Sequence, residues 1–287
     1  IRMATKDPTP WPPEVPAGEN PPNGAIIDYY LASSVSGPVT IDILDAASTV
    51  VRTYTSELKR DPDPAVQGTA YDKVCQAAPQ SPDCSVPLYW PSRIKSVPTS
   101  AGMHRISWNL RYEPLATERE EIEIAVPHRS SPPPSSPWAP PGNYTVRLTV
   151  AGKNYTQPLS VRLDPRVKTP VAALQESTTL SLEMYALART TRMAYGQAHD
   201  LGLQVAKLEQ TQPREGKAFK TQIDAVAPDE LHGEAREAAN DRRGAHPPTT
   251  LNQASDAALA ASLALQSADT APTAAQIAAC SHARSEA

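Results

Sequence analysis

The chain has 287 residues and a net charge of −4, and 31 of its residues are proline, about twice the average share. This length suffices for two ordinary domains. No apolar run approaches the ~18 residues of a membrane-crossing helix, so no membrane span is expected. The small negative charge disfavours a broad electrostatic contact with nucleic acid.

The amino-acid composition changes near residue 170. Of the 31 prolines, 26 precede this point, as do all four tryptophans, whereas alanine dominates the part that follows. Proline and aromatic residues favour turns and strands, and alanine favours helices. We therefore expect an α+β protein with two domains. An extended proline-rich linker is expected over 1–23, an antiparallel Ig-like β-sandwich with long proline-rich loops over 24–164, and an alanine-rich helical domain over 171–287.

Alternation of apolar and polar residues predicts the strands of the first domain. The alternating segments, in sequence order, are 25–31, 39–43, 49–54, 104–110, 144–150 and 155–163. A short turn joins the second segment to the third, and Ala151-Gly152 joins the last two, so each pair is expected to form a hairpin. Six or more short strands separated by turns are typical of an antiparallel sandwich.

Apolar residues in steps of three and four predict one long helix over about 178–210. Its stripe is expected to be a contact seam, whose members are Leu180, Met184, Leu187, Thr191, Ala194, Ala198, Leu201, Val205 and Leu208. Shorter helices are expected around 219–226, 251–265 and 272–277, the last with Pro272 in its first turn. Helices hide such stripes by packing together, so we expect a small α-helical bundle with one long helix. A two-stranded coiled coil is the alternative.

Motifs that carry catalysis or bind metals are missing from the sequence. It contains no HExxH, GxSxG, GxGxxG or CxxC, and no phosphate-binding GxxxxGK. His232-Gly233-Glu234 has the H-x-E form of zinc deaminases, but the cysteine ligands that should follow are lacking. The glutamates within 118–123 fit the solvent-exposed face of an edge strand better than they fit a catalytic carboxylate pair. We therefore expect no enzymatic activity, no metal and no cofactor in this protein.

Four aromatic residues in proline-rich loops are candidates for a glycan platform. Aromatic rings stack on sugar faces, and neighbouring prolines keep such a platform stiff. The candidates are Trp11, Tyr89, Trp90 and Trp138. The alternative, which we favour, is that these rings pack inward and close the ends of the sandwich.

Cysteine usage bears on the compartment. Cys75 and Cys84 lie nine positions apart in one loop, so a disulfide between them would close a short ring and would imply an exported protein. Two free thiols are the alternative. Cys280 lies in an alanine-rich helix, where we expect an inert thiol. The sequence begins Ile1-Arg2-Met3, and we take it for a fragment or a processed product, in which the lack of a signal peptide says nothing about location.

Four long strings of residues carry a family resemblance. They are ENPPNGAIIDYYL at 19–31, GPVTIDILD at 37–45, AGMHRISWNLRYEPL at 101–115 and WAPPGNYTVRLTVAGKNYTQPLSVRLDPRV at 138–167. Together they resemble the C-terminal region of large exported bacterial proteins, the sortilin-like BNR or Asp-box β-propeller proteins, which are often labelled glycosyl hydrolases. The resemblance implies that propeller repeats of the form S-x-D-x-G-x-T-W precede this region. This sequence has no such repeat, so no catalytic residue of the family carries over to it.

The residues and the resemblance together lead to one functional expectation. We expect a non-catalytic structural or interaction region that contacts the upstream β-propeller of its parent protein, or another protein, in the periplasm or outside a bacterial cell. The alternative is a glycan-binding accessory module of a carbohydrate-active protein, in which the loop aromatics would form the binding surface.

Overall fold

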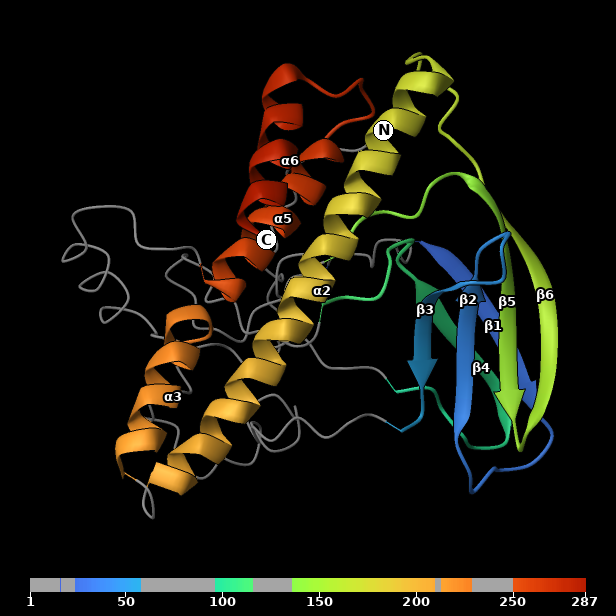
Figure 1. The fold of residues 1–287 in the computed structure, drawn as a ribbon. Coiled ribbons are helices and arrows are strands. Elements are labelled where there is room, and N and C mark those ends of the chain that lie inside the picture. The colour runs from blue at the N-terminus through green and yellow to red at the C-terminus, as the bar shows by residue number, and fades with distance from the viewer. Residues whose placement is uncertain (1–15, 17–23, 58–95, 116–135, 210–212, 229–249) are drawn as a thin grey trace. The chain divides into compact units, whose positions relative to one another are not determined.

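The computed structural model describes residue 16 and residues 24–57, 96–115, 136–209, 213–228 and 250–287 (Figure 1). The protein divides into two compact units, with the boundary between Val167 and Lys168. We call them the sheet unit and the helical unit and describe each by itself. None of the helices in the described ranges combines the length and the apolar character that a membrane crossing requires.

The sheet unit contains two antiparallel sheets, and the structure confirms a strand at each of the predicted segments. The strands are β1 (Ala25–Leu31), β2 (Val39–Leu44), β3 (Val50–Thr55), β4 (Gly102–Trp108), β5 (Gly142–Val150) and β6 (Lys153–Val161). One sheet pairs β1 with β4, and the other has the order β3-β2-β5-β6 (Figure 1). Neighbours in sequence are therefore not always neighbours in a sheet, because β4 returns to β1 and β5 returns to β2.

The alternation that predicts the strands also selects their buried faces. Val39, Ile41 and Ile43 are fully buried on one side of β2, and Trp108 is fully buried at the end of β4. Both sheets contribute to one hydrophobic cluster, because each has one apolar face that must leave water. The buried members of this cluster are Tyr29, Leu31, Val39, Ile41, Ile43, Val51, Val97, Trp108, Ala139 and Tyr144.

Two tight turns and one glycine fix how the strands connect. Ala151 and Gly152 have φ angles of 48° and 76°, the left-handed pair of a two-residue hairpin turn, and they join β5 to β6 as the sequence predicts. Asp45 closes the β2–β3 hairpin by accepting hydrogen bonds from the amides of Ala47 and Thr49. Gly24 precedes β1 with a φ of 106°, and a Cβ there would lie 1.9 Å from a backbone oxygen of β4. Only glycine fits that position.

The helical unit consists, in the described ranges, of one long helix and three shorter ones. They are α2 (Val171–Glu209), α3 (Pro213–Val226), α5 (Leu251–Leu265) and α6 (Ala274–Glu286). The long helix begins seven residues before its predicted start, directly after Pro170, whose carbonyl accepts the first helical hydrogen bonds.

The last helix differs from its prediction at both ends. Thr273 is its N-cap and forms a capping box with Gln276, so Pro272 lies before the helix rather than in its first turn. The helix also continues past Ile277 to Glu286, because the residues that follow are rich in the helix former alanine. A second capping box, Thr250 with Gln253, begins α5.

Candidate functional site

Most of the loop residues that the sequence singles out lie outside the described residues. These are Trp11, Tyr89 and Trp90 of the glycan platform and the cysteine pair Cys75 and Cys84. Trp138 is described, and it sits in a short segment paired with the residues that follow β4. The amide of Ala139 donates to the carbonyl of Leu110 at 2.7 Å, and Arg111 and Trp138 form an isolated antiparallel bridge.

The guanidinium of Arg111 covers one face of the Trp138 ring. Its central carbon lies 3.9 Å from the ring centroid, and its Nη1 donates to the carbonyl of Ser136 at 2.6 Å. This cation–π geometry holds the half-buried indole in place. A sugar could stack on that ring face only by displacing the arginine, so the contact favours the structural interpretation of Trp138.

The predicted seam of the long helix combines two rows of residues, each repeating every seven positions. The buried stripe differs from the prediction in one of these rows, the one that contains Leu180, Leu187 and Leu201. Met184 and Val205 are buried as predicted, and Leu180 and Leu187 are half-buried, but Leu201 is 51% exposed. The side chain of Leu208 lies outside the described part. The residues that are buried instead lie one position later in each case: Ser181 next to Leu180, Ala188 next to Leu187, and Gly202 next to Leu201.

Serine hydroxyls fasten α2 to α5 along this stripe. Ser181 Oγ donates to the Ser262 carbonyl at 2.9 Å, and Ser262 Oγ donates back to the Ser181 carbonyl at 2.7 Å. Ser177 Oγ donates to the Leu265 carbonyl, and Ser255 Oγ donates to the Ala188 carbonyl, both at 2.9 Å. Earlier residues of α2 meet later residues of α5, so the two helices are antiparallel. Small side chains permit the close approach that these bonds need.

These serines are structural rather than reactive. Ser181, Ser255 and Ser262 are 0–1% exposed, and each hydroxyl donates to a backbone carbonyl rather than to a histidine or a carboxylate. A serine nucleophile needs a neighbouring base that accepts its proton. The hydroxyls therefore satisfy their own hydrogen bonding inside the bundle.

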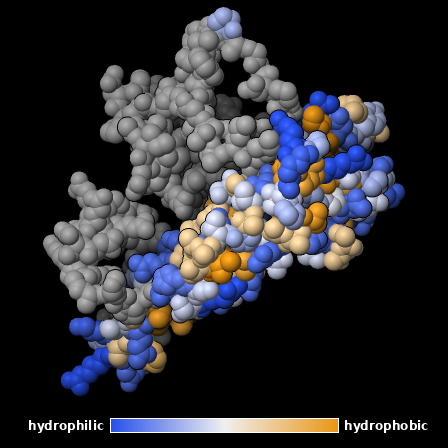
Figure 2. All heavy atoms as spheres, turned by 90° about the horizontal axis from the view of Figure 1, so that it is seen from above, coloured by the Kyte–Doolittle hydropathy of each residue, from blue (hydrophilic) through white to orange (hydrophobic). Residues whose placement is uncertain are grey.

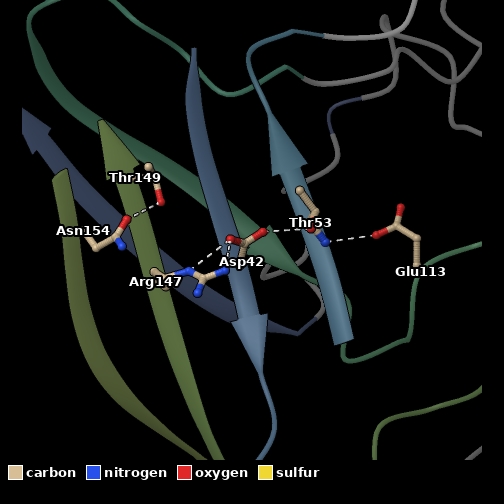
Figure 3. A network of polar contacts seen from close by, with 6 residues as sticks. All are labelled: Asp42, Thr53, Glu113, Arg147, Thr149 and Asn154. Atoms are coloured by element: carbon tan, nitrogen blue, oxygen red, sulfur yellow. Dashed lines mark hydrogen bonds and ion pairs between the residues drawn. The ribbon is translucent and has the colours of Figure 1, made fainter. Parts of the chain in front are cut away.

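A network of polar side chains lies on the face of the four-stranded sheet opposite the core (Figure 3). Asp42 stands at its centre and is only 9% exposed. Its Oδ2 accepts hydrogen bonds from Arg147 Nη2 at 2.8 Å and Nε at 3.2 Å, and its Oδ1 accepts one from Thr53 Oγ1 at 2.8 Å. The three residues lie directly opposite one another on β3, β2 and β5.

This network locks the register of three strands. Both carboxylate oxygens of Asp42 are engaged, and the charges of Asp42 and Arg147 cancel. Beside it, Thr149 Oγ1 donates to Asn154 Oδ1 at 2.8 Å between β5 and β6 (Figure 3). A slip of one residue would break each of these cross-strand contacts, so their function is to fix pairing. Alternation places Asp42 and Arg147 on the polar face, but nothing in the sequence shows that they pair across 105 positions.

Glu113 is a residue that the motif search does not single out. It follows β4, and its Oε2 accepts a hydrogen bond from the Thr53 amide at 2.9 Å (Figure 3). Its Oε1 lies 3.4 Å from Arg52 Nη1. The sequence offers no signal for this contact, because a glutamate in a loop is usually solvated.

The shifted pKa values of Tyr29, Tyr144 and Asp28 in the sheet unit also have structural causes. Burial raises the pKa of Tyr29 to about 12, and it raises the pKa of Tyr144 further above its usual range. Tyr29 OH donates to the Pro98 carbonyl and Tyr144 OH to the Pro140 carbonyl, both at 2.6 Å, so each phenol is a buried donor rather than a base. On the exposed face of the two-stranded sheet, the Arg105 guanidinium lowers the pKa of Asp28 through two hydrogen bonds.

The described residues include no cluster of three or more histidine, cysteine, aspartate or glutamate side chains that could hold a metal ion. Cys280 is fully buried in α6, and burial raises the pKa of its thiol, so the reactive thiolate is disfavoured. No protein-family model, curated protein or solved structure matches this sequence.

Proposed function

We propose that this protein is a non-catalytic structural and interaction region, the C-terminal part of an exported bacterial sortilin-like BNR-repeat propeller protein. Its role is to contact the upstream β-propeller of that protein. The strings at 19–31 and 138–167 that resemble this family include strands β1, β5 and β6. A periplasmic or secreted location follows from the same resemblance.

The strand arrangement supports an Ig-like sandwich as the first of two domains. A two-stranded sheet beside one with the order β3-β2-β5-β6 is compatible with the Greek-key connections of Ig-like folds. Tyr144 stands near the start of β5, and its hydroxyl donates to the carbonyl of Pro140 at 2.6 Å. This bond has the form of the tyrosine corner of such sandwiches. The helical domain then begins near Lys168, where the contacts divide.

The observation that carries the interaction role is the exposed apolar side chains of α2 and α3. Phe219 is 61% exposed, Met193 57%, Leu203 53% and Leu201 51%. In the view of Figure 2, apolar residues lie in small groups among polar ones on the described surface. Exposed large apolar side chains of this kind are candidates for contact with another protein, and Leu203 and Phe219 are the ones we propose to test.

The polar clusters support a role without catalysis. Asp42 is engaged by Arg147 and Thr53, and the buried serines of the helical unit donate to backbone carbonyls. A catalytic group needs a free lone pair or proton directed at a substrate. Each of these groups instead binds the protein itself.

The first test of the proposal is the reading frame upstream of Ile1, which should encode a β-propeller with S-x-D-x-G-x-T-W repeats. The purified propeller is then titrated against this protein in a calorimeter. We expect a stable complex that Leu203→Glu weakens at least about tenfold, because a charge in an apolar contact is costly. Gln204→Glu adds the same charge at the next exposed position of α2 and should leave the affinity unchanged.

Two results would contradict the proposal. One is an upstream frame without propeller repeats, and the other is a folded propeller that does not bind the folded protein. Titration with polysaccharides, followed by tryptophan fluorescence, separates the proposed role from a glycan-binding module. A saturable change that Trp138→Ala removes would favour the glycan-binding role instead.

A further inference from the structure

Helix α3 folds back along the second half of α2. Tyr195 OH donates to the Pro228 carbonyl at 2.9 Å, and a Cβ at Gly202 would lie 3.3 Å from Ile223 Cγ2. Gly202 comes after Tyr195 in α2, and its partner Ile223 comes before Pro228, so the two helices form an antiparallel hairpin (Figure 1). The exposed apolar side chains of the hairpin can therefore be assigned to one flank of this contact or to the other.

Two exposed leucines of α2 point to opposite flanks of this hairpin. Successive residues of an α-helix are about 100° apart around its axis. Leu201 precedes the buried Gly202 and Leu203 follows it, so the two leucines lie about 100° to either side of the contact with α3. They are 51% and 53% exposed, so one helix presents nearly equivalent leucines to two different surroundings.

Two apolar residues of α3 share the flank of Leu201. A local two-fold axis relates the helices of an antiparallel pair, so the residue before a buried position points to the same flank on both helices. Val226 directly precedes the buried Ala227, as Leu201 directly precedes Gly202. Phe219 lies two turns before Val226 in the sequence and so points the same way. We call Leu201, Phe219 and Val226 the Leu201 flank.

Charge distinguishes the two flanks. Between Pro213 and Val226, the charged residue that helical geometry places on the side of Leu201 is Glu215, and it lies in the first turn of α3, at the edge of the flank. On the opposite flank α3 places Lys217 and Asp224, each directly after a residue that faces α2. The Leu201 flank therefore suits an apolar partner surface, and the opposite flank suits a polar one.

Helix α6 shows that this flank of α2 accepts a neighbouring helix. Glu183 lies 18 positions, about five turns, before Leu201 and so points to the same side. Arg284 Nη2 of α6 donates to Glu183 Oε2 at 2.8 Å, so α6 lies on this flank along the first half of α2. Leu187 is half-buried there, whereas Leu201 is exposed. Along the second half of α2, none of the helices in the described ranges takes the place that α6 takes along the first.

We propose that the Leu201 flank is covered by the same flank of a second copy of this protein. Two antiparallel hairpins, each with one apolar face, form a four-helix bundle when these faces meet. A two-fold contact requires a surface that fits itself, and apolar side chains meet their own copies without like-charge repulsion. Three side chains expose far less than the ~800 Å² per partner of a standard interface, so we expect a weak dimer with a Kd of about 10–100 μM. This dimer goes beyond the proposed function, because the propeller contact is tested at Leu203, on the opposite flank.

The test compares Leu201→Glu with Leu203→Glu in the 287-residue protein. Both variants place the same charge on the same helix, at leucines of nearly equal exposure on opposite flanks. Sedimentation velocity from about 5 μM to about 500 μM spans the expected Kd, so the wild type should pass from monomer to dimer. L201E should raise the Kd of the dimer at least about tenfold, because a carboxylate in an apolar contact is costly, and L203E should leave it unchanged. Phe219→Glu, on the other helix of the flank, should weaken the dimer as L201E does.

A wild-type protein that stays monomeric over the whole range overturns the proposal, and so does an L203E variant that weakens the dimer as much as L201E. A monomeric wild type whose propeller complex is weakened by L201E would show that the propeller covers this flank instead. Far-UV circular dichroism checks that each variant keeps its helices, and F219E replaces L201E in the comparison if L201E loses them. The dimer is measured without the propeller, so its absence would not count against the propeller contact, and a missing propeller complex would not count against the dimer.

Discussion

Replacement of Ser181 by leucine tests which stripe of α2 lies against α5. Ser181 is fully buried, and its hydroxyl donates to the Ser262 carbonyl at 2.9 Å. Leucine removes this bond, at a cost of about 1 kcal/mol, and forces a larger side chain into a close contact, at about 1–3 kcal/mol. We therefore expect S181L to lower the free energy of unfolding of the helical unit by about 2–4 kcal/mol.

The comparison variant is Leu180→Ala, at the neighbouring position that the apolar pattern assigns to the seam. A fully buried leucine costs about 2–5 kcal/mol when it is cut to alanine, so the half-buried Leu180 should cost about 1–2 kcal/mol. S181A removes the hydroxyl without adding volume and should cost about 1 kcal/mol. Urea unfolding followed by far-UV circular dichroism measures the helices. All four tryptophans precede residue 170, so tryptophan fluorescence follows the sheet unit separately.

A larger cost for L180A than for S181L would refute this assignment, because Leu180 would then be the residue at the helix contact. The assignment would also be refuted if S181L lowered the urea midpoint measured by fluorescence as much as the midpoint measured by circular dichroism. The perturbation would then not be confined to the helices.

Three further predictions concern the sheet unit, each measured by urea unfolding with tryptophan fluorescence. Tyr144→Phe should cost about 1–3 kcal/mol, because the Pro140 carbonyl loses its buried donor. Ala151→Asn should raise the free energy of unfolding by about 1 kcal/mol, because asparagine tolerates the left-handed φ of 48° better than alanine does. The folded protein holds the Tyr29 proton up to a pKa of about 12 against the ordinary 10.0, so stability is full below pH 10 and falls as the pH rises toward 12. The loss should be about 2 kcal/mol.

Each of these predictions has its own control. Tyr155 is 57% exposed on the neighbouring strand, and Tyr155→Phe should cost little; an equal cost at both tyrosines would argue against the corner bond. For the turn, an unchanged or lower stability of A151N would mean that the hairpin does not need left-handed residues there. For the pH effect, Tyr29→Phe removes the titrating phenol and should reduce the loss between pH 10 and 12. A loss as large as that of wild type would show that Tyr29 is not its source.

Several features of the fold could be predicted because their causes are local. Alternation marks each strand, since successive side chains of a strand point to opposite faces. Ala151-Gly152 marks the last hairpin, and the change from proline to alanine near residue 170 marks the passage from strands to helices. Pro272 and Thr273 signal the beginning of the last helix to within a residue or two. The pairing of β1 with β4 has no such signal, because it joins segments about 77 positions apart.

Which residues of a helix or strand make a contact depends on the facing segment as much as on the residues themselves. The apolar pattern selects Leu180, Leu187 and Leu201 for the helix seam, because it weighs each residue by its hydrophobicity alone. Helix α5, which packs against α2, presents small buried residues, and these allow the two helix backbones to approach each other closely. These are Ala254, Ser255, Ala258 and Ser262.

When the two helices lie this close, a serine hydroxyl can donate a hydrogen bond to a carbonyl of the opposing helix. Ser181 is therefore the buried residue, and its neighbour Leu180 stays half-exposed. The same holds for Glu113, whose acceptor role exists only because a distant strand brings the Thr53 amide to it. The sequence by itself thus determined which residues form strands and helices. The tertiary structure decided which of them touch, because distance between backbones is a property of two segments and not of one.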